Sequence, residues 1–314
     1  MSPRSRESLP VLSGVPYLTD GGIETFLIHH RGLELPEFAA FPLLEQESGR
    51  AELADYYRPY LELAQRYGAG FILESPTWRA NPRWGAAVGY DEAGVARANE
   101  EAIALLEQLR ESDPADGPPV LISGCVGPHD DGYAPGTTLD AEGAQAYHSF
   151  QVQALAATSA DLVTAMTMTY VEEALGVARA AAAAGIPAVI SFTVETDGRL
   201  PSGQALAEAI EQVDGDPGSD VAYFMVNCAH PTHFDAVLGG DGDWVGRIRG
   251  LRANASRLSH AELDEAPDLD EGDPEDLGAR YAALCERLPN VNVLGGCCGT
   301  DHRHVGSIAA AVYG

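Results

Sequence analysis

Residues 161–192 read DLVTAMTMTYVEEALGVARAAAAAGIPAVISF. The two ends of this stretch, 161–165 and 187–192, are short apolar runs and predict strands. Residues 171–184 between them are rich in alanine and predict a helix, and Gly185 is typical of the position just past a helix end. A strand, a helix and a second strand in this order predict two parallel strands joined by a right-handed crossover.

The same alternation runs along the whole chain. It predicts strands at 16–20, 70–74, 119–124, 161–165, 187–192, 221–226, 244–249 and 291–294. The helices between and after them are predicted at 50–67, 93–110, 141–157, 171–184, 203–213, 231–238, 274–288 and 301–313. Eight such units in 314 residues predict an α/β fold of the closed (β/α)8, TIM-type barrel class. The alternative, an open doubly wound sheet, lacks the G-x-G-x-x-G fingerprint after any strand.

Nothing in the sequence divides the chain into separate parts. Residues 1–314 are expected to form one barrel domain, with 1–13 as an N-terminal extension. The acidic stretch DEAPDLDEGDPEDLG at 264–278 is expected to be a solvated excursion on the barrel rim before the last helix.

The charge balance restricts the partners. There are 47 acidic and 19 basic residues, a formal net charge of −28, and every basic residue is Arg. Such a surface repels phosphate, so nucleic acid and anionic membranes are poor partners. A chain without Lys has no residue that forms a Schiff base. The first residues resemble no secretory signal and no apolar run is long enough to cross a bilayer, so a cytoplasmic location is expected. The sequence does not fix an oligomeric state.

The chemistry-bearing residues collect after the predicted strands, where barrel enzymes place their active sites. Cys228 follows one strand, and Cys297 and Cys298 follow the last strand between glycines that permit a sharp bend. Three thiolates with one open position are typical of a catalytic zinc site. Cys125 and Cys285 are expected to be small buried hydrophobes, and no disulfide framework is expected.

Histidines offer a second way to hold a metal. His302 and His304 follow the cysteine pair, and His230 and His233 follow Cys228. We expect His304 to brace the loop behind the ligands and not to bind the ion itself.

Three motifs carry a family resemblance: GGCCGT at 295–300, NC at 227–228 and DGG at 20–22. With them the chain resembles the homocysteine S-methyltransferase family over nearly its whole length. The resemblance implies a (β/α)8 barrel with Zn²⁺ on Cys228, Cys297 and Cys298. It also implies that Asp20, Gly21 and Gly22 bind the amino-acid group of homocysteine. The family's S-F-T-x-x-x-D-G segment corresponds to Ser191, Phe192, Thr193, Asp197 and Gly198.

The resemblance has one departure. Many members carry a glutamate after the fourth strand that binds the substrate ammonium, whereas Met166 stands here and Glu173 matches only a later helix position. Another carboxylate must then bind the ammonium, or the acceptor is a different thiol. Asp20, Glu74 and Glu195 are candidates, with Glu74 the best placed. Taken together, the expected substrate-binding residues are Asp20, Gly21, Gly22, Glu74, Ser75, Thr77, Thr193 and Asn227.

The expected activity is zinc-dependent methyl transfer from a small onium donor to the thiolate of homocysteine, giving methionine. Displacing a methyl group from a cation releases a neutral product, and Trp78, Trp84 and Tyr170 offer ring faces for such a cation. S-methylmethionine is the preferred donor, before betaine and S-adenosylmethionine. The partners are therefore a small thiol and a methyl donor. A zinc hydrolase or lyase, or a zinc-binding protein without catalysis, are the alternatives of another class; three thiolates suit thiolate chemistry better than water activation.

Overall fold

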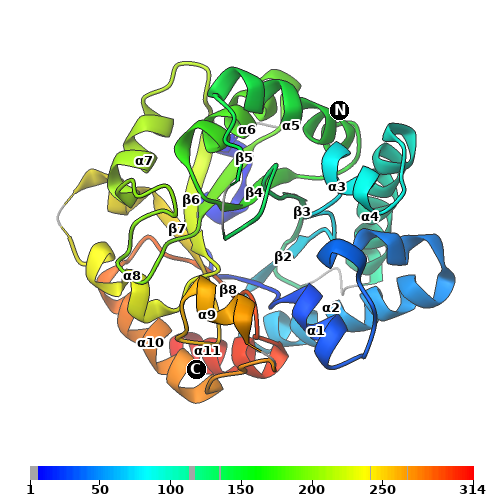
Figure 1. The fold of residues 1–314 in the computed structure, drawn as a ribbon. Coiled ribbons are helices and arrows are strands. Elements are labelled where there is room, and N and C mark those ends of the chain that lie inside the picture. The colour runs from blue at the N-terminus through cyan, green and yellow to red at the C-terminus, as the bar shows by residue number, and fades with distance from the viewer. Residues whose placement is uncertain (1–5, 113–116, 134–135, 241, 267) are drawn as a thin grey trace.

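The computed structural model describes residues 6–112, 117–133, 136–240, 242–266 and 268–314. Eight parallel strands close into a barrel in sequence order, β1 beside both β2 and β8, as the sequence predicts (Figure 1). The strands are β1 Tyr17–Thr19, β2 Gly70–Glu74, β3 Val120–Val126, β4 Leu162–Met168, β5 Ala188–Phe192, β6 Val221–Asn227, β7 Ile248–Ala253 and β8 Val293–Gly296.

Helices surround the barrel and pack their apolar faces on the strands. The eight that correspond to the predicted ones are α2 Glu47–Tyr67, α4 Glu92–Ser112, α5 Ala141–Ala156, α6 Val171–Ala184, α7 Leu206–Asp214, α8 Pro231–Leu238, α10 Pro274–Arg287 and α11 His302–Tyr313. Three shorter helices were not predicted: α1 Ile23–His29, α3 Pro82–Ala87 and α9 His260–Glu265. All three follow the carboxyl ends of strands, so they shape the mouth of the barrel. Among the described helices, none has the length and apolar character that spanning a bilayer requires.

The seventh strand lies four residues later than predicted. Residues 243–247 form a short 3-10 helix that buries Trp244, and the strand begins at Ile248. The prediction at 244–249 was wrong because Gly250 and Arg252 interrupt the apolar pattern of the true strand. Gly250 makes room for the Met225 side chain, since a Cβ there would lie 2.4 Å from its sulfur. Arg252 is a buried charge whose partners are on other strands.

Four other strands end later than predicted, and β6 does so by one residue, at Asn227. β3 and β4 run on to Val126 and Met168, and β8 spans Val293–Gly296 where 291–294 was predicted. Cys125 and Met166 therefore lie within strands and not in loops.

The N-terminal segment packs beneath the barrel. Val11 is fully buried and Leu9 nearly so, in a cluster with Tyr17, Ile72 and Val293 at the amino ends of the strands. Asn292 donates from Nδ2 to the Val11 carbonyl at 2.8 Å. Residues 9–11 thus close the bottom of the barrel, and the chemistry is left to the opposite end.

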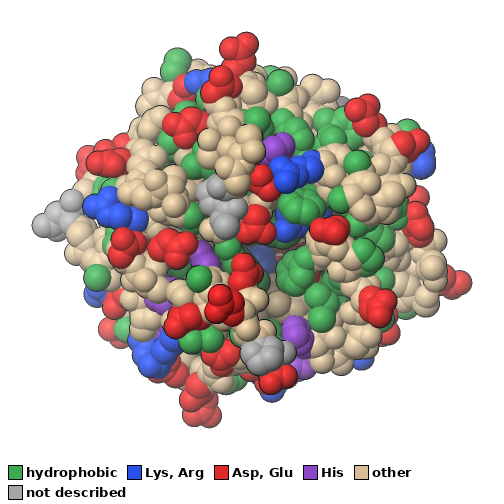
Figure 2. All heavy atoms as spheres, viewed as in Figure 1, with side chains coloured by type: hydrophobic (Ala, Val, Ile, Leu, Met, Phe, Trp, Pro, Cys, Tyr) green, Lys and Arg blue, Asp and Glu red, His purple; other side chains and the backbone are tan. Residues whose placement is uncertain are grey.

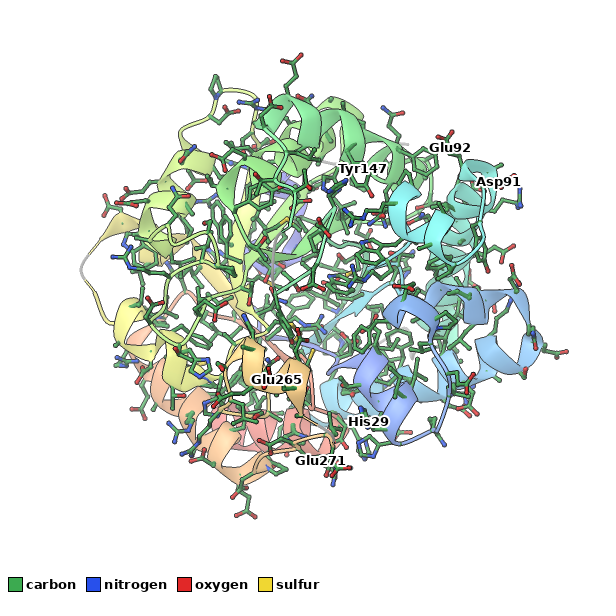
Figure 3. The ribbon with its side chains drawn as sticks, viewed as in Figure 1. His29, Asp91, Glu92, Tyr147, Glu265 and Glu271 are labelled. Atoms are coloured by element: carbon green, nitrogen blue, oxygen red, sulfur yellow. A yellow bond between two sulfur atoms is a disulfide. The ribbon has the colours of Figure 1, made fainter. Side chains whose placement is uncertain are left out.

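The open end of the barrel is strongly acidic. Figure 2 shows acidic side chains around a depression near the middle of this face. The segment between α9 and α10 lies on the rim, as predicted, with Glu265 and Glu271 on the side where His29 of α1 also lies (Figure 3). His30 pairs with Glu271 across 2.9 Å. This segment is mostly exposed, but Asp264, Asp268 and Asp270 also border the central cavity.

Candidate active site

A cavity of about 400 Å³ opens at the carboxyl ends of the strands. Nine of the residues expected in the site line it: Asp20, Gly21, Gly22, Glu74, Ser75, Trp78, Cys228, Cys297 and Cys298. Five others are not among its lining residues: Thr77, Trp84, Tyr170, Thr193 and Asn227. The lining also contains residues that the sequence did not single out, of which Glu24, Phe38, Arg79, Tyr133 and Arg252 carry chemistry.

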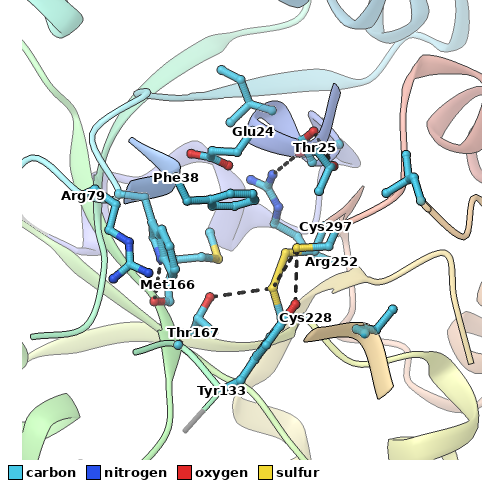
Figure 4. Close-up of a pocket in the computed structure, with 18 of the residues that line it drawn as sticks. Glu24, Thr25, Phe38, Arg79, Tyr133, Met166, Thr167, Cys228, Arg252 and Cys297 are labelled. Carbon is cyan, nitrogen blue, oxygen red and sulfur yellow. Dashed lines mark hydrogen bonds between the residues drawn. A yellow bond between two sulfur atoms is a disulfide. The ribbon is translucent and has the colours of Figure 1, made fainter. Parts of the chain in front are cut away.

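The three cysteines converge at one side of this cavity (Figure 4). Their Sγ atoms all lie within 4.8 Å of one another. Cys228 and Cys298 are 3.9 Å apart, whereas Cys228 and Cys297 form a disulfide, which corrects the expectation that no cysteines pair. The convergence that suits a metal is also what brings two sulfurs within bonding reach. Cys125 and Cys285 lie outside the cluster as free thiols.

Backbone geometry aims Cys228 into the cluster. Cys228 has φ +53° and Thr167 across from it has φ +64°, a region that non-glycine residues rarely adopt. Asn227 supports both: its Oδ1 accepts from the Thr167 N–H at 3.0 Å, and its Nδ2 donates to Thr167 Oγ1 at 2.8 Å. Strained residues of this kind concentrate at functional sites. Asn227 therefore holds the cluster from behind.

A second set of contacts supports the cluster from the rim. The Tyr133 hydroxyl donates to Cys298 Sγ at 3.4 Å, and its ring stacks on His260 at 4.1 Å. His260 Nε2 lies 2.7 Å from the Cys228 carbonyl oxygen, and its Nδ1 pairs with Glu195 at 3.1 Å. Thr193 is buried 3.4 Å from the same carbonyl. Thr193 and Glu195 thus act on the cysteines through the backbone and through His260.

The loop that carries Cys297 and Cys298 is fixed at the start of α11. Asp301 and His304 form a capping box, and His304 Nε2 lies 2.7 Å from the Glu271 carbonyl. His304 is fully buried and belongs to no metal-binding group found among the described residues. It braces the cysteine loop, as expected.

Asp20 is buried and heavily hydrogen-bonded. It accepts from Arg252 Nη2 at 2.7 Å, from the Tyr56 hydroxyl at 2.9 Å and from Thr19 Oγ1 at 2.9 Å. Arg252 in turn donates to Thr19 and to the carbonyls of Gly21 and Gly296. This ion pair ties β1, β7 and β8 together below the cavity, and removing one partner of such a pair typically costs about 3–5 kcal/mol.

Gly21 and Gly22 let the first loop touch the last. A Cβ on Gly21 would lie 2.6 Å from the Thr300 carbonyl, and one on Gly22 would lie 2.5 Å from the Cys297 carbonyl. The Gly22 N–H donates to the Thr300 carbonyl at 3.0 Å. The close approach of these loops is therefore a packing reason for the DGG sequence.

Glu74 is 6% exposed and faces the cavity. Its Oε1 accepts from Thr164 at 3.1 Å, while Oε2 has no hydrogen-bond partner among the described residues. Burial raises the pKa of Glu74 to about 7, although nearby Arg252 acts in the opposite direction. Ser75 and Thr77 are bonded to each other and to the Cys125 backbone, so they position the end of β2.

Glu24 is a second carboxylate in the cavity, from the first turn of α1 (Figure 4). Burial raises its pKa to about 7. No ion pair to Glu24 occurs among the described residues. The sequence offered one signal, the position of Glu24 just after DGG, but α1 was not predicted.

Met166, at the family's glutamate position, lines the cavity with 6% of its side chain exposed. Glu173, the other partial match, is a buried residue of α6 and pairs with His148 of α5 at 2.9 Å. Glu173 is therefore structural. Met166 occupies the place in the cavity where many family members have a glutamate.

Of the three predicted donor aromatics, only Trp78 reaches the cavity. Its edge meets the ring of Phe38, with ring centres 6.4 Å apart. Trp84 packs on the Arg79 guanidinium instead, and the buried Tyr170 accepts from the Leu139 N–H through its hydroxyl.

Comparison with known proteins identifies the relatives of this site. The model of a protein family described as homocysteine S-methyltransferase matches residues 17–312. The chain belongs to the homocysteine S-methyltransferase family. It is thus a methyltransferase by family, which agrees with the resemblance at DGG, NC and GGCCGT.

Individual relatives support the same assignment. The chain is 26% identical over 311 residues to the homocysteine S-methyltransferase of Escherichia coli strain K12, covering 93% of this chain and 94% of that one. Two crystal structures of the homocysteine methyltransferase MmuM from Escherichia coli share the fold. The oxidized form has a TM-score of 0.72 at 23% identity and the metallated form 0.70 at 22% identity, each covering 95% of this chain and 96% of that one.

Proposed function

We propose that this protein transfers a methyl group from a small onium compound to the thiolate of homocysteine, giving methionine, at a zinc site formed by Cys228, Cys297 and Cys298. The observation that carries the proposal is the convergence of these three Sγ atoms at the cavity of a family member.

The donor set fits zinc. Three cysteine sulfurs that all lie within 4.8 Å of one another are ligands that zinc prefers in proteins. The Escherichia coli relative has been crystallised in a metallated form, which supports a metal-binding function for a cysteine cluster of this kind. When bound, the zinc ion would supply the positive charge that lowers the pKa of a substrate thiol.

The protein contributes charge and position to the reaction. Once the disulfide between Cys228 and Cys297 is reduced, three protein thiolates around one open position would make the site electron-rich, which favours an attacking sulfur over an activated water. The acceptor sulfur forms a bond to the methyl carbon while the bond from that carbon to the onium atom breaks. The electron pair of the broken bond stays with the donor, which leaves as a neutral molecule. Arg252 and Asp20 fix the loops on which the cysteines stand.

The acceptor's ammonium group needs a carboxylate, because Met166 has none to offer. Asp20 is engaged by Arg252, and Glu195 by His260. Glu74 retains an oxygen without a partner at the cavity and remains the best candidate, with Glu24 as the second. Homocysteine and 4-mercaptobutyrate, which lacks the amino group, distinguish the cases. Glu74→Gln should raise the KM for homocysteine about 10-fold or more and leave that for 4-mercaptobutyrate nearly unchanged.

The donor assignment rests on ring faces and charge. Trp78 and Phe38 line the cavity, and each aromatic face attracts an onium group by about 0.5–2 kcal/mol. S-methylmethionine is the donor we favour, before betaine and S-adenosylmethionine. A matrix of thiols against donors on metal-loaded protein tests the pair. Activity that requires methylcobalamin or a methylfolate, with every onium compound inert, contradicts the assignment.

The metal itself is tested by substitution. Cys228→Ser, Cys297→Ser and Cys298→Ser should each lower the zinc content from about one per chain and abolish methyl transfer, with the far-ultraviolet circular dichroism unchanged. Cys285→Ala is the matched control, because this free thiol lies on α10 outside the cluster. X-ray absorption spectroscopy of the bound zinc should show mainly sulfur ligands. Mainly nitrogen and oxygen ligands, or full activity of Cys297→Ser, would overturn the proposal.

A further inference from the structure

Two buried arginines line the cavity, and they differ in how fully they are satisfied. Arg252 donates through Nε, Nη1 and Nη2 to Gly296, Thr19, Asp20 and Gly21. Arg79 is nearly as buried, at 7% exposure, but makes one hydrogen bond among the described residues, from Nη1 to the Asp130 carbonyl at 3.3 Å. Its Nε–H has no partner among the described residues.

Arg79 is held in place by ring contacts. Its guanidinium carbon lies 3.6 Å from the ring centre of Trp84 and 4.3 Å from that of Trp78. The nearest carboxylate, Asp131, is 3.9 Å from Nη2, beyond hydrogen-bond distance, and its side chain is 47% exposed. The aromatic contacts fix the guanidinium plane. Nε is sealed from solvent, whereas Nη2 is not and makes no hydrogen bond to a described residue, so Nη2 is the donor left for another partner.

Such an arrangement is costly without a ligand. A buried donor that lacks a partner costs about 1–3 kcal/mol, and more when the group is charged. Burial lowers the pKa of Arg79 to about 10, so the group keeps its charge at neutral pH. A carboxylate is the natural partner, because its two oxygens match the geometry of a guanidinium edge.

The rest of the cavity selects the kind of anion. Glu24 and Glu74 line the same space, and the protein as a whole carries a net charge of −28. These charges oppose multivalent anions such as phosphates. A zwitterion, with a cation toward the carboxylates and the rings and a carboxylate toward Arg79, satisfies both signs.

The position of Arg79 favours the donor over the acceptor as the source of that carboxylate. The acceptor sulfur must reach the cysteine cluster. In Figure 4 Arg79 lies across the cavity from Cys297 and Cys228, with Met166 between them. Arg79 also adjoins Trp78, the predicted donor aromatic that reaches the cavity.

We propose that Arg79 binds the carboxylate of the methyl donor, so that the site selects onium carboxylates over onium ions that lack one. This inference rests on the proposed methyl transfer but names a residue and a substrate class that the transfer alone does not require. Arg79 acts as a specificity-determining residue and takes no part in breaking the methyl bond.

The kinetic test compares dimethylsulfonioacetate with trimethylsulfonium, which lacks the carboxylate. With homocysteine as acceptor, the wild type should prefer the carboxylate by about 10- to 100-fold in kcat/KM, the range expected for a hydrogen-bonded charge. Arg79→Gln should reduce this preference to within about 3-fold, chiefly through KM. Arg79→Lys keeps the charge but loses the planar edge, and should fall between the two.

Arg83→Gln is the matched control. Arg83 also lies over Trp84, at 5.4 Å, and pairs with Asp130, but it is 41% exposed and does not line the cavity. It should keep the wild-type preference. A wild type that does not distinguish the two sulfonium compounds overturns the inference while leaving methyl transfer intact.

An acceptor arm identifies the source of the carboxylate. If Arg79→Gln instead erases the preference for homocysteine over 3-mercaptopropylamine, the carboxylate belongs to the acceptor and the donor assignment is wrong. A binding experiment needs no turnover. Calorimetric titration of the metal-loaded protein compares its affinity for betaine with its affinity for tetramethylammonium. Tighter binding of betaine that Arg79→Gln removes supports the inference even if no thiol is methylated, in which case the proposed function alone fails. Equal binding of the two ions overturns it.

Discussion

The buried carboxyl group of Glu74 lies in the proposed binding site and lowers the stability of the folded protein. Its carboxyl group is buried, one oxygen lacks a partner among the described residues, and Asp20 lies near enough to oppose its ionisation. Burial outweighs the attraction of Arg252, and the pKa of Glu74 rises to about 7. A carboxylate with this environment is poorly satisfied until a cationic ligand arrives.

Glu74→Gln should therefore stabilise the ligand-free protein at pH 8. A folded pKa above the unfolded value means that the folded state holds a proton which the unfolded chain has lost. The free energy of unfolding of the wild-type protein therefore falls as pH rises from about 4.5 to 7, and the advantage of the glutamine variant grows over the same range. Glutamine removes the cost of the buried charge, which is up to about 3 kcal/mol because each unit of the pKa shift from 4.5 to about 7 is worth about 1.4 kcal/mol. Urea unfolding at pH 5 and pH 8 measures the effect.

The gain should be small at pH 5 and full at pH 8. Glu100→Gln, on the exposed face of α4, controls for the loss of one acidic charge from an acidic protein. An equal effect of Glu74→Gln at both pH values contradicts the assignment of a buried, raised-pKa carboxyl.

Residue-level prediction from sequence succeeded where a motif fixes both residue type and place. Cys228, Cys297 and Cys298 converge because they follow strands whose carboxyl ends share one edge. Arg79 and Arg252 were missed for physical reasons: arginine is normally exposed, and only the structure shows the ring contacts of one and the ion pair of the other. The paired cysteines were missed because spacing alone does not say which sulfurs touch.

Two helices of the barrel contain an interior glycine, and the space beside that glycine decides whether a side chain fits there. On α6, a Cβ at Gly176 would lie 2.4 Å from the Ala144 Cβ and 2.6 Å from backbone of α5. On α11, a Cβ at Gly306 would meet the Leu63 side chain at an ordinary 3.5 Å. The two glycines occupy similar helix interiors but differ in the room beside them.

Gly176→Ala should destabilise the protein by about 1–3 kcal/mol, because α5 and α6 must separate. Gly306→Ala should stabilise it by about 0.5–1 kcal/mol, since alanine favours the helix and fits the space. Thermal or urea unfolding of the two variants side by side measures both signs. A shift of the same sign in both would show that helix propensity, and not the contact between α5 and α6, decides the effect.

At the element scale all eight strands were predicted and three helices were missed, but the ends of the predicted helices were placed more accurately than those of the strands. Helix ends carry local signals, and α6 and α8 match their predicted limits at Val171–Ala184 and Pro231–Leu238. The seventh strand was misplaced because a buried Arg and a packing Gly break its apolar pattern. The short helices α1, α3 and α9 have no apolar period long enough to detect in sequence.

The whole molecule carries a large charge imbalance. Its 47 acidic residues exceed the 19 basic ones, and acidic groups crowd the face around the cavity (Figure 2). Self-repulsion of this size destabilises the compact state, and salt screens it. The barrel class itself was predictable from sequence, because eight regular strand–helix units leave few other ways to pair parallel strands.

Raising KCl from 0.1 to 1 M should therefore raise the melting temperature, by about 5 °C or more. Sucrose at matched osmolality tests for a general solute effect, because it leaves the charges unscreened. A melting temperature that falls with KCl would mean that attractive ion pairs, such as Arg179 with Asp216, outweigh the net repulsion.

The pairing of β8 with β1 determines when, as well as where, the site can form. Tyr17 pairs with Val293, and the Gly296 N–H donates to the Asp20 carbonyl. These contacts join segments separated by about 275 residues, and such distant pairings form late and slowly in folding. During synthesis, Cys228 leaves the ribosome well before Cys297 and Cys298. Because Cys297 and Cys298 follow the last strand, the three cysteines cannot come together before the segment that closes the barrel has been made.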